Sequence, residues 1–355
     1  MASGRLISRP LAFLRKNPAH VPESIRRALP SLVAAACAVG LLGWEIHKHG
    51  WAFFFQLTLN GITLGAVYAL IALGYTMVYG ILKLLNFAHG DVYMVGSFIG
   101  YGVLTSLGGS ANPSVPIWLL ITLMLLAAML GAGVLGVAIE RFAYRPLRAA
   151  PRIAPLISAL GVSFFLQNSA LLLFGASFRN YDPFTLFGFG GVHFGSAVFM
   201  SWPRAGAVIA AVILMVGLVL LVRRTQIGKA MRAVSFDREA AAMMGIDVDR
   251  VIAATFFIGS ALAGAAGVMF GLVFSQIYHF MGFLAGLKGF TAAVVGGIGS
   301  IPGAMLGGLI VGCVEQWAQG YINGNWSDLF VFAILIVFML VRPTGLLGTR
   351  AINKV

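Results

Sequence analysis

The most constraining feature of this sequence is a series of long apolar runs. They occupy approximately residues 56–80, 90–107, 117–139, 154–174, 204–222, 251–274, 285–300, 303–322 and 328–341. Each run is long enough, or nearly so, to cross the roughly 30 Å hydrocarbon core of a bilayer as a helix. The pattern therefore predicts an all-α integral membrane protein, a polytopic bundle of about 8–10 transmembrane helices.

Composition supports this class of fold. The chain is 59% hydrophobic and 10% charged, whereas soluble domains carry about 25% charged residues. Its 45 glycines also fit, because small residues let helices approach closely in lipid. Glycine pairs four residues apart, at 61 and 65, 303 and 307, and 308 and 312, predict flat faces for helix packing.

Residues 1–50 differ from the rest of the chain. The first 30 are basic and interrupted by prolines, which predicts a cytoplasmic arm. The apolar run at 32–44 is short for a span and lacks a convincing cleavage site after it, so it is interpreted as a possible extra transmembrane helix. Residues 51–350 then form the main membrane domain.

Charge fixes the expected orientation. With the N-terminus inside, all but four of the 24 Lys and Arg residues fall on the cytoplasmic side, the exceptions being Lys48, Arg179, Arg204 and Lys288. This is the bias of the positive-inside rule, and it predicts that both termini are cytoplasmic. The net charge of +13 then requires no nucleic acid partner.

The longest charged stretch inside the apolar part of the chain is residues 223–250. It carries six basic and four acidic residues, and positions 237–244 within it are rich in good helix formers. Gly245 is suited to end that helix. We expect a short helix on which a soluble cytoplasmic partner docks; a solvated loop that only fixes topology is the alternative.

Residues 285–322 contain a glycine-rich break. The sequence from 296 to 303 reads GGIGSIPG, between two short apolar segments. It predicts a tight reversal or a re-entrant or broken helix pair, because non-helical backbone at depth needs protein or a water-lined cavity around it.

Polar residues close to the spans are candidates for a translocation path. The candidates are Asn60, Tyr75, Tyr79, Asn86, His89, Gln167, Asn168 and Thr291. Each could instead serve as an interhelical hydrogen bond or an interface anchor. If residues 86–91 are helical, Asn86 and His89 share a face and Asp91 points elsewhere; the alternative is that Asn86 caps the next span.

Three further polar positions bear on mechanism. Glu315 is the plausible membrane-centre carboxylate for an ion-coupled carrier, and Lys288 is either a boundary anchor or a pathway charge. Glu140 is interpreted with Arg141 as a cytoplasmic boundary pair.

Enzyme chemistry is not indicated. The sequence contains no GxxxxGK[ST] phosphate loop and no defensible catalytic constellation, and Cys37 and Cys313 lack metal-ligand spacing. We therefore expect no catalytic residues, no metal site and no cofactor on this chain. If ATP drives it, another polypeptide binds the ATP.

Several blocks together resemble the permease of bacterial branched-chain amino-acid ABC importers of the LivH type. They lie at residues 60–70 (NGITLGAVYAL), 79–80, 86–91 (NFAHGD), 140–146 (ERFAYRP), 157–161 (ISALG), 289–304 (GFTAAVVGGIGSIPGA) and 342–348 (RPTGLLG). The resemblance runs in register over about residues 55–350. The first 50 residues exceed the usual short N-terminus of that family.

The resemblance implies that residues 51–350 are an ABC importer permease domain in the bacterial inner membrane. Its partners would be a second related permease, two ABC ATPase subunits that carry ATP and Mg, and a periplasmic substrate-binding protein. The coupling loop would be 223–250, with contacts from Asp237, Arg238, Glu239, Ala240, Ala241 and Gly245. Leucine and related amino acids are the implied substrates; urea or short amides, or less well an ion-coupled secondary amino-acid carrier, are the alternatives.

Overall fold

The computed structural model of the chain describes residues 40, 43–44, 47–148, 150–151, 153–195 and 198–348. The chain divides into two units, Met1–Lys48 and His49–Val355, and the description below concerns the second. The predicted cytoplasmic arm lies outside the described residues, and so does most of the predicted extra span at 32–44.

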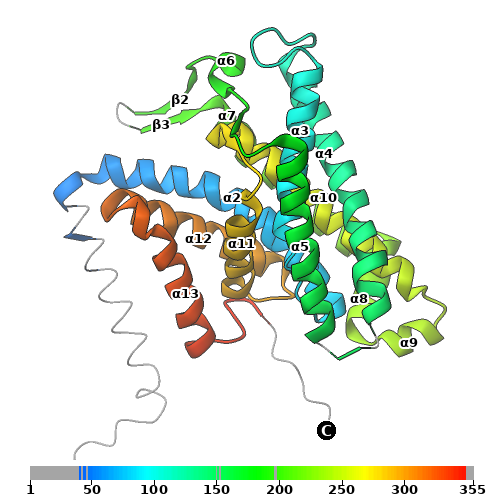
Figure 1. Cartoon of the computed structure of the whole chain (residues 1–355). Helices are drawn as coiled ribbons and strands as arrows, with labels where there is room; N and C mark the ends of the chain where they lie inside the picture. The colour runs from blue at the N-terminus through cyan, green and yellow to red at the C-terminus, as the bar shows by residue number, and fades with distance from the viewer. Residues whose placement is uncertain are drawn as a thin grey trace, which may run out of the picture. The chain divides into compact units, whose positions relative to one another are not determined.

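Each of the nine apolar runs corresponds to a helix (Figure 1). These helices are α2 (Trp51–Leu82), α3 (His89–Ser106), α4 (Ile117–Ile139), α5 (Ile153–Phe174), α7 (Trp202–Arg224), α10 (Val248–Phe274), α11 (Met281–Gly296), α12 (Ile301–Tyr321) and α13 (Ser327–Val341). Within the described chain, 7 helices are long and apolar enough to cross a membrane. Helix α11 is shorter, with 16 residues, and α3 is less apolar. The polytopic all-α fold is thus confirmed.

Helix α2 forms the centre of the bundle. It is 32 residues long, and 94% of its most apolar window is buried, against 11% for α13. At 1.5 Å per residue it extends about 48 Å, well beyond a 30 Å hydrocarbon core. Figure 1 shows α2 and α12 running side by side, with α4 and α5 at a steep angle to them.

The predicted glycine faces account for the α2–α12 packing. A Cβ on Gly61 would lie 2.6 Å from Cys313 Cα, and one on Gly312 would lie 2.3 Å from the Gly65 backbone nitrogen. Gly308 meets Ala69 equally closely. Since the contacts move up one helix as they move down the other, the two helices pack antiparallel with their backbones almost touching, as small residues allow in lipid.

The predicted tight reversal joins α11 to α12. The expected helix at 285–300 begins earlier, at Met281, and ends at Gly296, because Gly297 (φ 108°) and Gly299 (φ 94°) adopt left-handed conformations that stop it. The C-terminal segment then covers the end of α11: Leu346 N–H donates to Val295 O and Leu347 N–H to Gly296 O, both at 2.9 Å. These bonds satisfy two carbonyls that a helix end leaves free.

Short helices and strands lie at the two ends of the bundle. Helix α6 (Pro183–Phe187) and the hairpin β2 (Gly191–Phe194) and β3 (Val198–Ser201) lie at the top in Figure 1. Strand β1 (Arg179–Asn180) pairs antiparallel with β4 (Gln276–Ile277). At the opposite end lie α8 (Gln226–Phe236) and α9 (Arg238–Met243), and α4 continues into a π-helical turn (Glu140–Tyr144) and a 3₁₀ turn (Arg145–Leu147).

Candidate functional site

The charged stretch folds into two consecutive helices, α8 and α9. Thr225 caps α8 by accepting a hydrogen bond from Gly228 N–H at 3.1 Å. Asp237 caps α9 and accepts from the backbone N–H groups of Glu239 and Ala240 at 3.0 and 3.1 Å. A carboxylate at this position satisfies free N–H groups and complements the helix dipole.

Helix α9 ends as its sequence predicts. Gly245 N–H donates to Ala242 O at 3.0 Å and Ile246 N–H donates to Ala241 O at 3.1 Å. This is the Schellman pattern, and it needs the left-handed conformation that Gly245 adopts, with φ at 81°. The short helix expected between residues 237 and 244 is therefore present.

One face of the α8–α9 pair holds it to the bundle. Met231 and Val234 of α8 and Ala241 of α9 are buried. The guanidinium of Arg238 donates to the carbonyl of Ile81, in the last turn of α2, at 2.5 Å. The pair is thus attached directly to the end of the central helix.

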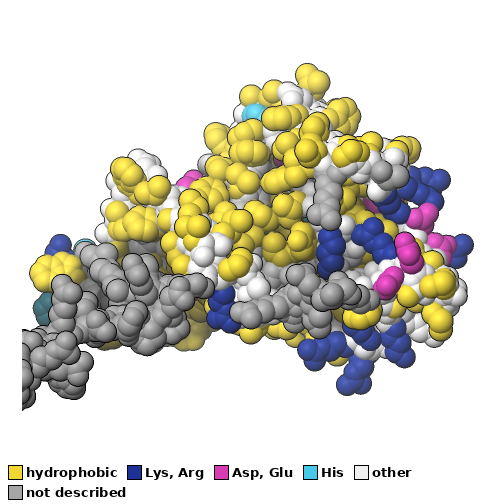
Figure 2. Space-filling view, turned by 90° about the horizontal axis from the view of Figure 1, so that it is seen from below, with side chains coloured by type: hydrophobic (Ala, Val, Ile, Leu, Met, Phe, Trp, Pro, Cys, Tyr) yellow, Lys and Arg dark blue, Asp and Glu magenta, His cyan; other side chains and the backbone are white. Residues whose placement is uncertain are grey.

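The other face of the pair is exposed and partly apolar. Phe236, Met243 and Met244 are 84%, 82% and 83% exposed, and Glu239 and Ala240 are exposed beside them. Figure 2 shows that Lys and Arg side chains gather over this end of the molecule. Of the six predicted coupling positions, Ala241 faces the bundle, so its role is to hold the helix.

A partly buried charge cluster lies at the same end. Arg148 contacts Glu140, which is 3% exposed, and reaches Asp249 of α10 at 2.5 Å. Arg145 also contacts Asp249. Glu140 was interpreted as the partner of its neighbour Arg141. Instead it pairs with Arg148, which directly follows the π-helical and 3₁₀ turns after α4.

The predicted path residues fall into separate places. Tyr75 and His89 meet, with ring centroids 4.9 Å apart, and His89 packs on Gly74, where a Cβ would lie 2.1 Å from its ring. Gln167 of α5 is buried and donates to Asp91 at 3.0 Å, beside Ser163, which also donates to Asp91.

Four other path candidates lie apart from these. Asn60 accepts a hydrogen bond from Arg204 at 2.7 Å. Asn168 is exposed and donates to Phe164 O of its own helix. Tyr79 is half-buried, and Thr291 donates to Leu287 O of its own helix. The eight candidates therefore do not line one cavity.

The NFAHGD segment differs from the expected geometry. Helix α3 begins at His89, so Asn86 lies in the preceding loop and the two residues do not share a helical face. Asn86 Oδ1 accepts from Ala88 N–H at 3.1 Å and from the Tyr144 hydroxyl at 3.2 Å. The residue at the N-cap position is Ala88. Asp91 has different neighbours from His89, as expected: it accepts a hydrogen bond from Gln167 of α5.

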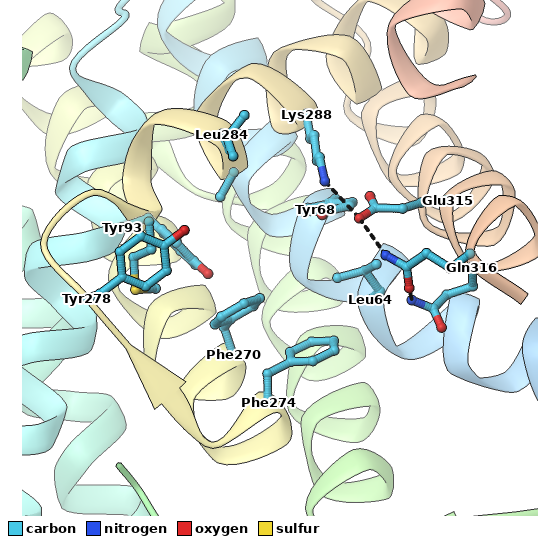
Figure 3. A pocket seen from close by; sticks show the side chains of 13 residues that line it. Leu64, Tyr68, Tyr93, Phe270, Phe274, Tyr278, Leu284, Lys288, Glu315 and Gln316 are labelled. Atoms are coloured by element: carbon cyan, nitrogen blue, oxygen red, sulfur yellow. Dashed lines mark hydrogen bonds and ion pairs between the residues drawn. The ribbon is translucent and has the colours of Figure 1, made fainter. Parts of the chain in front are cut away.

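A cavity of about 290 Å³ lies among α2, α3, α10, α11 and α12. One part of its lining is apolar and aromatic, including Leu64, Phe270, Phe274 and Leu284 (Figure 3). The polar part includes Tyr93, Lys288, Glu315 and Gln316. Ligand sites typically combine such an apolar lining with a few polar groups.

Lys288 is the centre of an ion-pair cluster at this cavity. Its ammonium lies 2.8 Å from Glu315 and 2.6 Å from Asp328 of α13. Lys288 and Glu315 are buried, whereas Asp328 is 43% exposed. Sequence reasoning left Lys288 open between a boundary anchor and a pathway charge and named Glu315 as a membrane-centre carboxylate, since charged residues in apolar helices stand out, but it did not predict that the two pair. It also missed Tyr68 and Tyr93.

A bundle of apolar helices around one buried helix, with a charged helical pair at one end and a cavity inside, is a polytopic membrane protein of the permease type. The chain belongs to the family described as "Branched-chain amino acid transport system / permease component", whose model matches residues 57–339.

Relatives with the same description span most of the chain. The high-affinity branched-chain amino acid transport system permease protein LivH of Salmonella typhimurium is 44% identical over 306 residues, covering 85% of this chain and 98% of the relative. BraD of Pseudomonas aeruginosa is also 44% identical, over 305 residues, with the same coverage. A probable LivH of Methanocaldococcus jannaschii is 30% identical over 300 residues, covering 79% and 88%. The chain is therefore a transport permease rather than an enzyme.

Proposed function

We propose that this chain is the membrane-spanning subunit of an ATP-driven importer that carries branched-chain amino acids across the bacterial inner membrane. The α8–α9 pair carries the proposal, because its exposed face holds Phe236, Met243 and Met244 while its other face is attached to α2. The 44% identity to permeases of high-affinity branched-chain amino acid systems supports the substrate.

The proposal includes three kinds of partner. Two ABC ATPase subunits supply ATP and Mg and dock on the α8–α9 pair, a second related permease completes the membrane unit, and a periplasmic protein delivers the substrate. The α8–α9 end faces the cytoplasm, since the Lys and Arg side chains gather there (Figure 2).

Motion passes from the ATPases through α9 into α2. Closure of the ATPase pair presses on the exposed side of α9, whose Arg238 is bonded to Ile81 O. Tyr68 of the same helix lies beside the cavity, 13 residues and about 20 Å from Ile81 along α2. When the end of α2 near Ile81 moves, α2 tilts, and the shape of the cavity beside Tyr68 therefore changes.

An ion-coupled carrier would need a carboxylate available to bind the coupling ion. Glu315, the candidate for that role, is paired with Lys288 at 2.8 Å. The importer is accordingly the function that we propose.

The experiment changes Met243 and Met244 together to Glu. Both side chains are more than 80% exposed, so the unfolding temperature of the chain should not change. We expect the ATPase subunits to be lost from detergent pull-downs and leucine uptake to fall at least tenfold. The matched control is Phe184→Glu, an exposed apolar residue of α6 at the other end, which should keep the ATPases bound.

Retention of both ATPases and of full uptake by the double variant would overturn the docking role of α9. A wild-type chain that purifies without ATPases, yet moves leucine in liposomes under an ion gradient, would overturn the importer itself.

A further inference from the structure

The cavity among α2, α3, α10, α11 and α12 is lined by charged, hydroxyl and aromatic side chains that have no part in the proposed docking of the ATPases on α8 and α9. Its charged part is lined by Lys288 and Glu315, whose ammonium and carboxylate lie 2.8 Å apart; Asp328, which contacts Lys288 from outside the lining, is 43% exposed. The second carboxylate oxygen of Glu315, Oε2, is buried and has no hydrogen-bond partner among the described residues. A buried carboxylate oxygen without a partner is costly, so this part of the cavity favours a cationic group that donates a hydrogen bond to it.

A second polar group faces the cavity from α3. Tyr93 is 0% exposed, lines the cavity, and its hydroxyl has no hydrogen-bond partner among the described residues. In Figure 3 the Tyr93 hydroxyl and Glu315 lie on different sides of the space. A buried hydroxyl without a partner is costly, and a ligand that accepts its hydrogen bond would remove that cost.

The remaining lining is apolar, and it adds a third property that a ligand must match. Phe270, Phe274, Leu64 and Leu284 present apolar surface between the two polar parts (Figure 3). Apolar surface of this kind stabilises a buried aliphatic group in proportion to the area that it covers. A molecule with a cation, an anionic acceptor and an aliphatic side chain satisfies all three parts.

We propose that this cavity is a binding site for the amino acid during its passage, formed by this chain alone. The substrate ammonium lies against Glu315, its carboxylate accepts a hydrogen bond from Tyr93, and its aliphatic side chain lies on Phe270 and Phe274. This inference rests on the proposed function and extends it, because it assigns recognition of the substrate to named residues of the permease. Such a site is expected to select against urea and simple amides, which have no ammonium for Glu315.

The cavity lies in the half of the bundle away from α8 and α9. The α11–α12 turn lies at the α8 end, where Ile301 and Gly299 share a small cavity with Met231. Glu315 follows Ile301 by 14 residues, about 21 Å along α12. The site is thus close to the end at which a periplasmic protein would release its substrate.

The test uses the complete transport complex, purified with this chain and its partner subunits. Binding of radiolabelled leucine is measured without the periplasmic protein, and uptake is measured in liposomes with it. Tyr93→Phe removes only a hydroxyl that has no hydrogen-bond partner in the described part of the chain, so its folding should be intact. We expect leucine binding to fall at least fivefold in Tyr93→Phe and at least tenfold in Glu315→Gln, with uptake rates reduced in parallel.

Two matched controls separate binding from structure. Tyr101→Phe makes the same change on the same helix outside the cavity lining, and should bind leucine as the wild type does. Asp328→Asn removes one carboxylate from the Lys288 cluster but does not line the cavity, so its loss should not exceed about twofold.

The outcomes are distinguishable. Normal binding and uptake in both Tyr93→Phe and Glu315→Gln, in a wild-type complex that transports leucine, would overturn this site and leave the importer standing. Equal losses in Asp328→Asn and Glu315→Gln would also overturn it, because the cluster would then act only as a structural ion pair. A wild-type complex that neither binds nor transports leucine would overturn the proposed function and this site with it.

Discussion

Arg148 connects three parts of the charged end of the molecule. It follows the π-helical and 3₁₀ turns after α4, contacts the buried carboxylate of Glu140, and reaches Asp249 at the start of α10. Its own side chain is 20% exposed. Together with Arg145, which also contacts Asp249, Arg148 thus holds the 140–148 turn against the helix that follows the α8–α9 pair.

Replacement of Arg148 by Met should destabilise the chain by about 3 kcal/mol, because Glu140 then remains buried without its partner. The loss can be measured as a lower thermal unfolding midpoint in detergent. The control is Arg250→Met, whose ion pair with Asp247 is mostly exposed and should contribute less than about 1 kcal/mol. Equal midpoints for the two variants would contradict the role given to Arg148.

At the scale of elements, the α2–α12 pair shows how glycine determines packing. The two helices meet through Gly61, Gly65, Gly308 and Gly312, and the space for a Cβ is already filled by the opposite backbone. Close backbone approach of this kind gains dispersion contacts that lipid tails would otherwise supply. Helix α7 presents glycines of a different kind, such as Gly217, where a Cβ would meet nothing described within 4 Å.

The same substitution should therefore have opposite effects on the two helices. Gly312→Ala places a methyl group 2.3 Å from Gly65 N and should destabilise by about 1–3 kcal/mol through overpacking. Gly217→Ala meets open space and should be neutral or stabilising by up to about 1 kcal/mol, through higher helix propensity. The measurement is the thermal unfolding midpoint of each variant in the same detergent. A destabilising shift of equal size in both variants would contradict the close backbone contact between α2 and α12.

At the scale of the whole molecule, the two ends carry different elements. One end carries α8 and α9, and basic side chains gather there (Figure 2), whereas the other end carries α6 and the β2–β3 hairpin (Figure 1). The positive-inside rule predicts that the first end lies in the cytoplasm.

Single-cysteine labelling tests this orientation. In a chain with Cys37 and Cys313 replaced by Ala, a cysteine in place of Met243 should react with a membrane-impermeant maleimide only in inverted vesicles. A cysteine in place of Phe194, which is 55% exposed on β2, should react only from the outside of intact spheroplasts. Labelling of both from the same side would reject the assigned orientation.

Local sequence patterns were sufficient to predict the apolar helices, the reversal between α11 and α12, the end of α9 at Gly245 and the glycine faces. Hydropathy, glycine conformation and capping depend on a residue and its near neighbours, so they can be recognised without knowing the fold. The resemblance to LivH-type permeases was likewise carried by contiguous blocks, and the family match over residues 57–339 confirms it.

Contacts between residues far apart in the sequence could not be predicted and became known only from the folded structure. Asp91 meets Gln167 across 76 positions, Arg148 meets Asp249 across 101, and the cavity draws on five helices. Lys288 and Glu315 each stand out in an apolar helix, but their ion pair depends on how α11 and α12 dock. A polar group in a membrane protein must find its partner inside the bundle, and which partner it finds is determined by packing rather than by separation along the sequence.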